Sequence, residues 1–149
     1  MDIPTLLKAV DNESNLVLLD LTHSKIKKMN LDVLKELGFH PSKLAKIMQS
    51  LDAYRYVDTM NDLKYGAYIR WITIPIPSST IQSNGNGNLT KGAIFCELKI
   101  NDDGVYVVYK NFYHKHYQFK LDDCLVFQKL SRQEEVLLYA LDHIQDNTK

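Results

Sequence analysis

The segment VYVVYKNFYHKHYQFK, from Val105 to Lys120, decides how the second half of this chain folds. It holds six aromatic residues, two histidines, three lysines and no acidic residue. Its apolar and polar residues alternate with the period of a β-strand, so we expect two strands at about 105–110 and 113–120. One face of the second strand would carry Tyr113, Lys115, Tyr117, Phe119 and Leu121, and the other His114, His116, Gln118 and Lys120. The pattern favours an aromatic core face and a solvated histidine face.

The same period predicts three further strands, at about 66–74, 93–100 and 124–129. The sequence NDDG, which ends at Gly104, predicts a tight turn because glycine adopts a positive φ at no steric cost. The segment PIPSSTIQSNGNGNLTKG is rich in turn-forming residues and predicts a long loop that includes residues 78–92. A last helix begins at the capping box Ser131-Arg-Gln-Glu134. Its expected apolar face consists of Val136, Leu137, Ala140, Leu141 and Ile144.

The first 62 residues have mainly the period of helices. Pro4 suits the first turn of a short helix. Residues 15–21 form an apolar run that fits a helix or a buried strand. Asn30 is predicted to be the N-cap of a helix that stops at Gly38. Residues 42–51 predict another helix, whose apolar stripe is Leu44, Ile47, Met48 and Leu51.

These patterns predict an α+β protein. A helical N-terminal region, residues 1–62, would pack on a small five-stranded antiparallel sheet, barrel-like in the SH3-like or OB-like manner. The sheet and the C-terminal helix that closes it would span residues 63–149. Because 149 residues suit a single domain, we expect the two parts to form one compact unit.

The composition limits the classes of partner and compartment. The 18 basic and 18 acidic residues balance, so no long-range field attracts nucleic acid or anionic membranes, and a nucleic-acid surface would have to be a local patch. Cys96 and Cys124 form no CxxC pair or disulfide framework, which is typical of a reducing compartment. The first residues lack the pattern of a signal peptide, and the apolar runs are too short to span a bilayer. We therefore expect a cytoplasmic protein without a membrane partner.

A local binding face on the sheet is the sharpest functional hypothesis. Small barrels bind single strands by stacking bases on aromatic rings and by contacting phosphates with basic side chains. Trp71 would point away from its neighbours Tyr68 and Arg70. The candidate surface residues are Tyr106, Lys110, His114, His116, Lys120, Tyr68 and Arg70, with Phe95, Lys115 and the loop at 78–92 as further contributors. Ordinary strand patterning explains the same residues, and we favour it.

Three other kinds of site have less support. His114 and His116 could share a metal ion with Glu97, but a site needs more ligands than two histidines, so we expect no metal and no cofactor. The segment LDVLKELGFHPSKLAKIMQ fits a DNA-binding helix-turn-helix, with Ser42, Lys43, Lys46 and Gln49 toward the groove. A plain helical hairpin has the same apolar spacing and is favoured. No phosphate-binding loop, nucleophile elbow or zinc-protease motif occurs, so we expect a non-enzymatic protein.

Three segments together resemble a group of known proteins: KYGAYIRWITI (64–74), GAIFCELKINDDG (92–104) and CLVFQKLSRQEEVLLYALDHI (124–144). They are similar to small, mostly uncharacterised proteins of the giant, nucleocytoplasmic large DNA viruses, including mimivirus-like and algal-virus members. The resemblance covers the β part and the last helix. It implies a viral protein made in the cytoplasm or virus factory of an infected eukaryotic cell. It carries no catalytic motif and implies no activity.

Two functions follow as expectations. The favoured function is that of an interaction or scaffold module, a virion component or a host-factor binder. It would bind a viral or host protein or associate with itself. The alternative is a nucleic-acid-binding barrel that acts in viral transcription, replication or translation control. An exposed apolar patch would support the first function and a basic stripe along the sheet the second. A pocket with convergent ionisable residues of shifted pKa would instead favour an enzyme.

Overall fold

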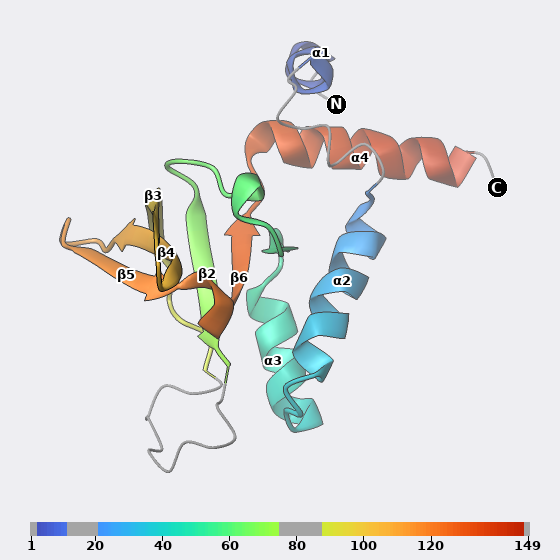
Figure 1. The fold of residues 1–149 in the computed structure, drawn as a ribbon. Coiled ribbons are helices and arrows are strands. Elements are labelled where there is room, and N and C mark those ends of the chain that lie inside the picture. The colour runs from blue at the N-terminus through green and yellow to red at the C-terminus, as the bar shows by residue number, and fades with distance from the viewer. Residues whose placement is uncertain (1–2, 12–20, 75–87, 148–149) are drawn as a thin grey trace.

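The computed structural model describes residues 3–11, 21–74 and 88–147, and this part of the chain has an α+β architecture (Figure 1). The helices are α1 (Ile3–Asp11), α2 (His23–Lys35), α3 (Pro41–Ser50) and α4 (Arg132–Asn147). The strands are β1 (Tyr54–Val57), β2 (Tyr68–Thr73), β3 (Ala93–Asn101), β4 (Gly104–Lys110), β5 (His116–Lys120) and β6 (Cys124–Lys129). Two single-turn 3₁₀ helices are η2 (Met60–Asp62) and η3 (Leu121–Asp123). The predicted α+β class is confirmed.

The strands form one antiparallel, open sheet in the order β1-β6-β2-β3-β4-β5. The prediction of five strands was therefore wrong by one, and the sheet does not close into a barrel. The missed strand is β1, which lies in the predicted helical region and pairs with β6 from Tyr54 opposite Lys129 to Val57 opposite Val126. Four residues are too few to reveal a period of two, so only the distant partner strand identifies β1.

Although open, the sheet is strongly curved. Phe119 of β5 stacks on Trp71 of β2 with ring centroids 4.6 Å apart, while β3 and β4 lie between these strands in the sheet order. A bulge between Phe95 and Glu97 in β3 increases the local twist. The concave face encloses the main hydrophobic core, whose buried members are Val57, Leu63, Ile69, Trp71, Ala93, Phe95, Val107 and Val126.

Helices α2 and α3 cover the opposite face of the sheet at its β1-β6-β2 end (Figure 1). A second core cluster lies between them and the strands, with Leu34, Ile47, Leu51, Ile72, Leu125 and Phe127 buried. The predicted stripe of the third helix is confirmed, because Leu44 and Met48 also pack against this cluster. The β3-β4-β5 end of the same face carries no described helix, which makes it the accessible part of the sheet.

Asn30 is not an N-cap, as the sequence predicted, but a buried residue inside α2. The helix begins earlier, after Thr22, whose hydroxyl accepts a hydrogen bond from the backbone N–H of Lys25. The Asn30 amide instead donates to the carbonyl oxygen of Tyr54 at 3.0 Å and accepts from the N–H of Tyr56 at 2.8 Å. Its side chain thus satisfies the outer edge of β1, a tertiary role that local sequence does not reveal.

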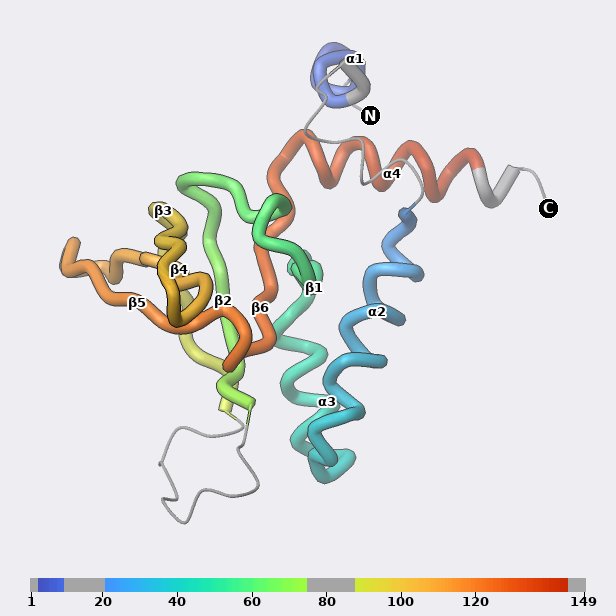
Figure 2. Tube along the Cα trace, in the orientation of Figure 1, coloured from blue at the N-terminus to red at the C-terminus, as the bar shows by residue number. Residues whose placement is uncertain are grey.

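Helix α4 begins at the predicted capping box. The Ser131 N–H donates to the Glu134 carboxylate at 3.0 Å, and the Glu134 N–H donates to the Ser131 hydroxyl at 3.2 Å. The buried stripe of α4 includes Leu137 and Leu138, whereas the predicted core residue Ile144 is 59% exposed. Helix α1 packs beside α4 through Ala9 and Leu137 (Figure 2). Among the described helices, none has the length and apolar character needed to cross a membrane.

Two predicted segments lie wholly or largely outside the described residues. They are the apolar run at 15–21, of which only Leu21 is described, and the long loop, of which residues 75–87 are not. At the end of that loop, Leu89 forms a β-bridge with Ile72. The predicted NDDG turn is confirmed between β3 and β4, with Gly104 at φ +133°.

Candidate binding surface

Six of the seven candidate surface residues lie on one face of the sheet, opposite the main core. The register pairs Tyr68 with Ile94, Ile94 with Lys110, and Lys110 with His116, so this row crosses β2, β3, β4 and β5. A parallel row consists of Lys99, Tyr106 and Lys120. We call the part of this face on β3, β4 and β5 the outer face; its side chains are Ile94, Glu97, Lys99, Tyr106, Val108, Lys110, His116, Gln118 and Lys120. Glu97, Lys99, His116 and Gln118 are exposed, whereas Val108 is buried and the other four are half-buried. Alternation along the strands predicted that His116 and Lys120 share a face and that Tyr68 and Arg70 do, whereas the strand register that brings these residues together with Tyr106 and Lys110 was not predicted.

The outer face is a locally basic patch on a chain of zero net charge. Lys99, Lys110 and Lys120 contribute three positive charges against the one carboxylate of Glu97. Tyr106 lies between two of these lysines in the register. The charge of this face is therefore complementary to negative charge.

His114 is the exception, because it lies in the turn between β4 and β5 and not in a strand. The side-chain oxygen of Asn111 accepts hydrogen bonds from the N–H groups of Tyr113 at 2.9 Å and Lys115 at 3.1 Å, and His114 adopts φ +62°. The predicted strand at 113–120 therefore starts only at His116. Tyr113, predicted as a core residue, is 84% exposed, and His114 does not share a strand face with His116.

The two aromatic residues of β5 that were predicted to lie in the core, Phe119 and Tyr117, differ in burial. Phe119 packs into the main core against Trp71 and Tyr109, as predicted. Tyr117 lies on the same face, with its ring centroid 5.9 Å from that of Tyr109, but 48% of its surface is exposed. Burial raises the pKa of Tyr109, and the nearby Tyr117 and Cys124 raise it further, so its phenol stays protonated at neutral pH.

Tyr68 and Arg70 differ in their availability. The Arg70 guanidinium donates to the carbonyl oxygens of Thr90 at 2.8 Å and Ser50 at 3.2 Å, so it joins β2 to α3 and to the chain before β3. Tyr68 is 38% exposed, and its ring lies 6.4 Å from that of Phe112. The ammonium group of Lys129 lies 5.9 Å from the Tyr68 ring centroid. Arg70 is thus a structural residue, while Tyr68 belongs to the surface.

An exposed aromatic patch adjoins the outer face, and sequence reasoning did not predict it. It consists of Tyr68 and Phe112, whose rings are neighbours, and of Tyr113, which follows Phe112 in the chain; Phe112 and Tyr113 are 70% and 84% exposed at the tip of the β4–β5 hairpin. Solvation of large apolar rings is unfavourable, so a cluster of them marks an interaction site more often than isolated exposed residues do. The available signal was the turn sequence Lys110-Asn-Phe-Tyr, which places two rings outside the strands.

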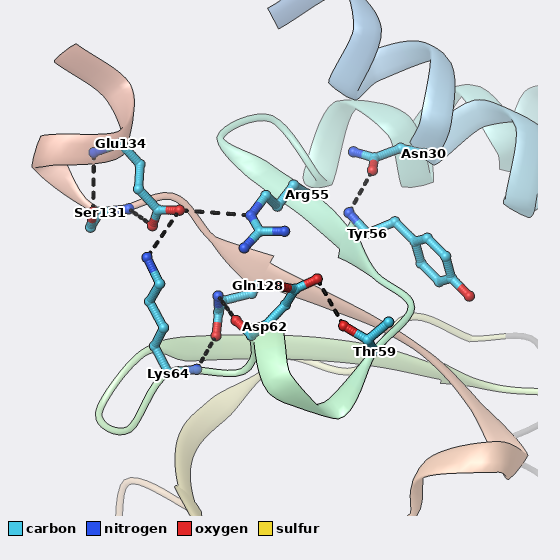
Figure 3. A network of polar contacts seen from close by, with 9 residues as sticks. All are labelled: Asn30, Arg55, Tyr56, Thr59, Asp62, Lys64, Gln128, Ser131 and Glu134. Atoms are coloured by element: carbon cyan, nitrogen blue, oxygen red, sulfur yellow. Dashed lines mark hydrogen bonds and ion pairs between the residues drawn. The ribbon is translucent and has the colours of Figure 1, made fainter. Parts of the chain in front are cut away.

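A buried polar network lies where α4 begins, beside β1 and β6 (Figure 3). The Glu134 carboxylate lies 3.7 Å from Nε of Arg55 and 3.5 Å from Nζ of Lys64, and the Arg55 and Glu134 side chains are 4% and 2% exposed. Gln128 accepts from the Lys64 N–H at 2.8 Å and donates to the Asp62 carbonyl at 3.0 Å. Nε and Nη2 of Arg55 make no hydrogen bond to described atoms. This network joins β1, β6 and α4 and explains why charged residues occur inside the fold.

The other predicted sites are not assembled in the described part of the chain. Phe95 is 4% exposed and cannot stack on a base. The described residues contain no group of three side chains suited to hold a metal ion. Helices α2 and α3 pack through their apolar faces on the sheet as a helical hairpin. Burial raises the pKa of the Cys124 thiol to about 11, so at neutral pH it is a protonated, poorly nucleophilic group.

A pocket of about 440 Å³ lies between α2, the end of α3 and β1, with Ile26, Leu51 and Leu130 among its lining residues. At its edge, Nδ1 of His23 contacts the Asp142 carboxylate, which also accepts from the His23 N–H at 3.1 Å. The residues that line the pocket include no serine or cysteine.

Comparison with protein families, curated proteins and solved structures finds no match. The function is therefore argued from the surface itself.

Proposed function

We propose that this chain is a non-enzymatic interaction module that binds a protein partner through the aromatic patch and the adjoining outer face. The observation that carries the proposal is the exposure of Phe112, beside Tyr68, and of its neighbour Tyr113, at the tip of a hairpin whose turn is hydrogen-bonded to Asn111. Aromatic rings bury much area with little loss of side-chain entropy, and they are enriched at the centres of protein interfaces. A ready-formed hairpin lowers the ordering cost of binding.

The arrangement of the strands supports an SH3-like reading of the β part. Strands β2 to β6 are neighbours in the order β6-β2-β3-β4-β5, and η3 connects β5 directly to β6. The stacking of Phe119 on Trp71 supports the same curled shape. In this interpretation, β1 is an addition to a strongly curved, open SH3-like sheet, and the hairpin tip projects from it as a recognition element.

The resemblance to giant-virus proteins supports a viral context for this module. The partner is then a viral or host protein met in the host cytoplasm, the virus factory or the virion. Both unpaired cysteines accord with a reducing compartment.

A double substitution at the hairpin tip tests the proposal. Phe112→Ala with Tyr113→Ala removes two exposed rings without touching the core, so we expect the fold to stay within about 0.5 kcal/mol of the original stability. We expect binding of the partner to weaken by at least about tenfold, as the loss of interface hot spots does. Affinity purification from extracts of cells that produce the protein, with quantitative mass spectrometry, measures the loss.

The matched control is Tyr139→Ala, which removes an equally exposed ring (61%) from α4, away from the patch. A partner captured equally by the original chain, the tip variant and the control would contradict the proposal. If the tip variant and the Tyr139→Ala control both lose the same partner, exposed aromatic rings bind that partner without a defined site on the protein.

The basic row on the outer face supports single-stranded nucleic acid as a second candidate. Lys99, Tyr106 and Lys120 lie side by side across three strands, an arrangement that places a ring between cations. Fluorescence anisotropy with labelled single-stranded RNA, single-stranded DNA and duplex DNA, at low and physiological salt, tests it. We expect micromolar binding that weakens steeply with salt and is lost in Lys99→Glu with Lys120→Glu. Absence of binding at low salt rules this candidate out.

A further inference from the structure

We propose that the free edge of β5 is an acceptor for an extended acidic segment of a partner protein, which adds to the sheet as a seventh strand. This inference rests on the proposed protein-binding function and specifies the partner's conformation and charge. A sheet edge presents a row of backbone N–H and C=O groups, which pair readily with another chain unless they are covered. The two edges of this sheet differ in whether their backbone groups are already covered.

The β1 edge is already satisfied. Asn30 of α2 donates to the carbonyl of Tyr54 and accepts from the N–H of Tyr56, so a side chain takes the place of a neighbouring strand. Helix α2 then covers this edge through the second core cluster. No partner strand can pair with β1 without displacing α2.

The β5 edge is open among the described residues, where β5 pairs with β4 alone. Hydrogen bonding at the hairpin decides which groups face outward: the Asn111 N–H donates to the Lys115 carbonyl at 3.0 Å. Bonded and non-bonded pairs alternate in an antiparallel ladder, so Tyr117 and Phe119 bond inward to β4. The backbone N–H and C=O groups of His116 and Gln118, and the N–H of Lys120, therefore point away from the sheet, while the Lys120 carbonyl belongs to the N-cap of η3.

The side chains of β5 do not obstruct this edge. His116, Tyr117 and Gln118 are exposed, and the five-residue strand contains no proline and no bulge. At about 3.4 Å per residue the edge is about 17 Å long, enough for five residues of a partner. Tyr117 would contact the partner's side chains on one face of the new strand, and His116 and Gln118 those on the other.

Charge complementarity selects the partner. From Val105 to Lys120 the chain has no acidic residue, and Lys110 and Lys115 lie beside the start of β5. Acidic residues begin only after the strand, at Asp122 in η3. The positive charge also opposes pairing between two copies of β5, because antiparallel self-pairing would bring like charges together. An extended acidic segment of another protein is therefore the occupant that this edge fits.

The test uses a fluorescein-labelled peptide of alternating glutamate with valine or threonine, eight residues long. We expect it to bind the full chain, as measured by fluorescence anisotropy at low and physiological salt. Hydrogen exchange followed by NMR should show slowed exchange at the amides of His116, Gln118 and Lys120, the three that point outward. A peptide of the same sequence, N-methylated at alternate residues along one edge, should bind at least about tenfold more weakly because it cannot form the ladder.

The matched variant is Gln118→Pro, which removes one outward N–H and no bond to β4, with Gln118→Ala as its control. We expect the proline variant to lose at least about tenfold in affinity and the alanine variant to bind normally. Equal binding of the N-methylated peptide, or no binding of the acidic peptide at low salt, would overturn the inference. A dimer that forms through β5, detected by analytical ultracentrifugation, would also overturn the inference. Displacement of the bound acidic peptide by single-stranded RNA would do the same, if the RNA displaces it equally from the original chain and from the proline variant.

Failure of this inference can be distinguished from failure of the proposed function. If partner capture depends on Phe112 and Tyr113 but is unchanged in Gln118→Pro, the aromatic patch binds the partner without strand addition. If the proline variant and the tip variant both capture it normally, the proposed binding surface fails as well.

Discussion

Trp71→Ala should lower the free energy of unfolding by about 3–5 kcal/mol, the usual cost of truncating a large buried aromatic residue. Trp71 is 8% exposed, and its ring lies 4.5 Å from Tyr109 and 4.6 Å from Phe119, measured between centroids. These contacts hold β5 over β2, so the substitution removes both packing area and the curvature of the sheet. Since domains of this size have about 5–15 kcal/mol of stability, this substitution should remove about a fifth of the stability or more.

The measurement is urea denaturation followed by circular dichroism, because Trp71 is the only tryptophan and the variant has no indole fluorescence. Tyr113→Ala serves as the control and should change stability by less than about 0.5 kcal/mol, since its side chain is 84% exposed. A cost below about 1 kcal/mol for Trp71→Ala would mean that the aromatic stack does not hold the sheet together.

The features that sequence predicted well are those that local chemistry determines. The capping box at Ser131 and Glu134 and the turn at Gly104 involve residues within three positions of one another. The period of two likewise identified β2, β3, β4 and β6, because each is long enough to show alternation. The same alternation predicted that His116 and Lys120 share one face of β5, and the strand register puts Lys110 on that face as well.

The features that sequence missed depend on distant partners or on a single side chain. Asn30 has the residue type of a cap, but its hydrogen bonds go to a strand more than twenty residues away. In the hairpin, Asn111 folds the chain into a turn and delays the start of β5, which moves Tyr113 from the predicted core to the surface. The aromatic patch is therefore a product of turn geometry, which hydrophobic periodicity cannot report.

Glu134→Ala should be the most destabilising single substitution in the polar network, at about 3–5 kcal/mol, because it leaves the Arg55 charge buried without a counter-ion. The Glu134 carboxylate lies 3.7 Å from Nε of Arg55, and both side chains are at least 96% buried. The substitution also removes the acceptor of the Ser131 N–H at the start of α4, which adds about 1 kcal/mol. Urea denaturation at neutral pH measures the total.

Three further variants distinguish the stabilising effect of the buried ion pair from that of the helix cap. Glu135→Ala, at the exposed neighbouring position, should cost less than about 0.5 kcal/mol, and Glu134→Gln, which can still cap the helix, should isolate the loss of the ion pair. Arg55→Met in the Glu134→Gln background should recover stability, because a buried charge without a partner is worse than an apolar side chain in its place. If Glu134→Gln is as stable as the original chain, the carboxylate acts only as a cap. Arg55 must then be stabilised by water at its Nε and Nη2 atoms rather than by charge pairing.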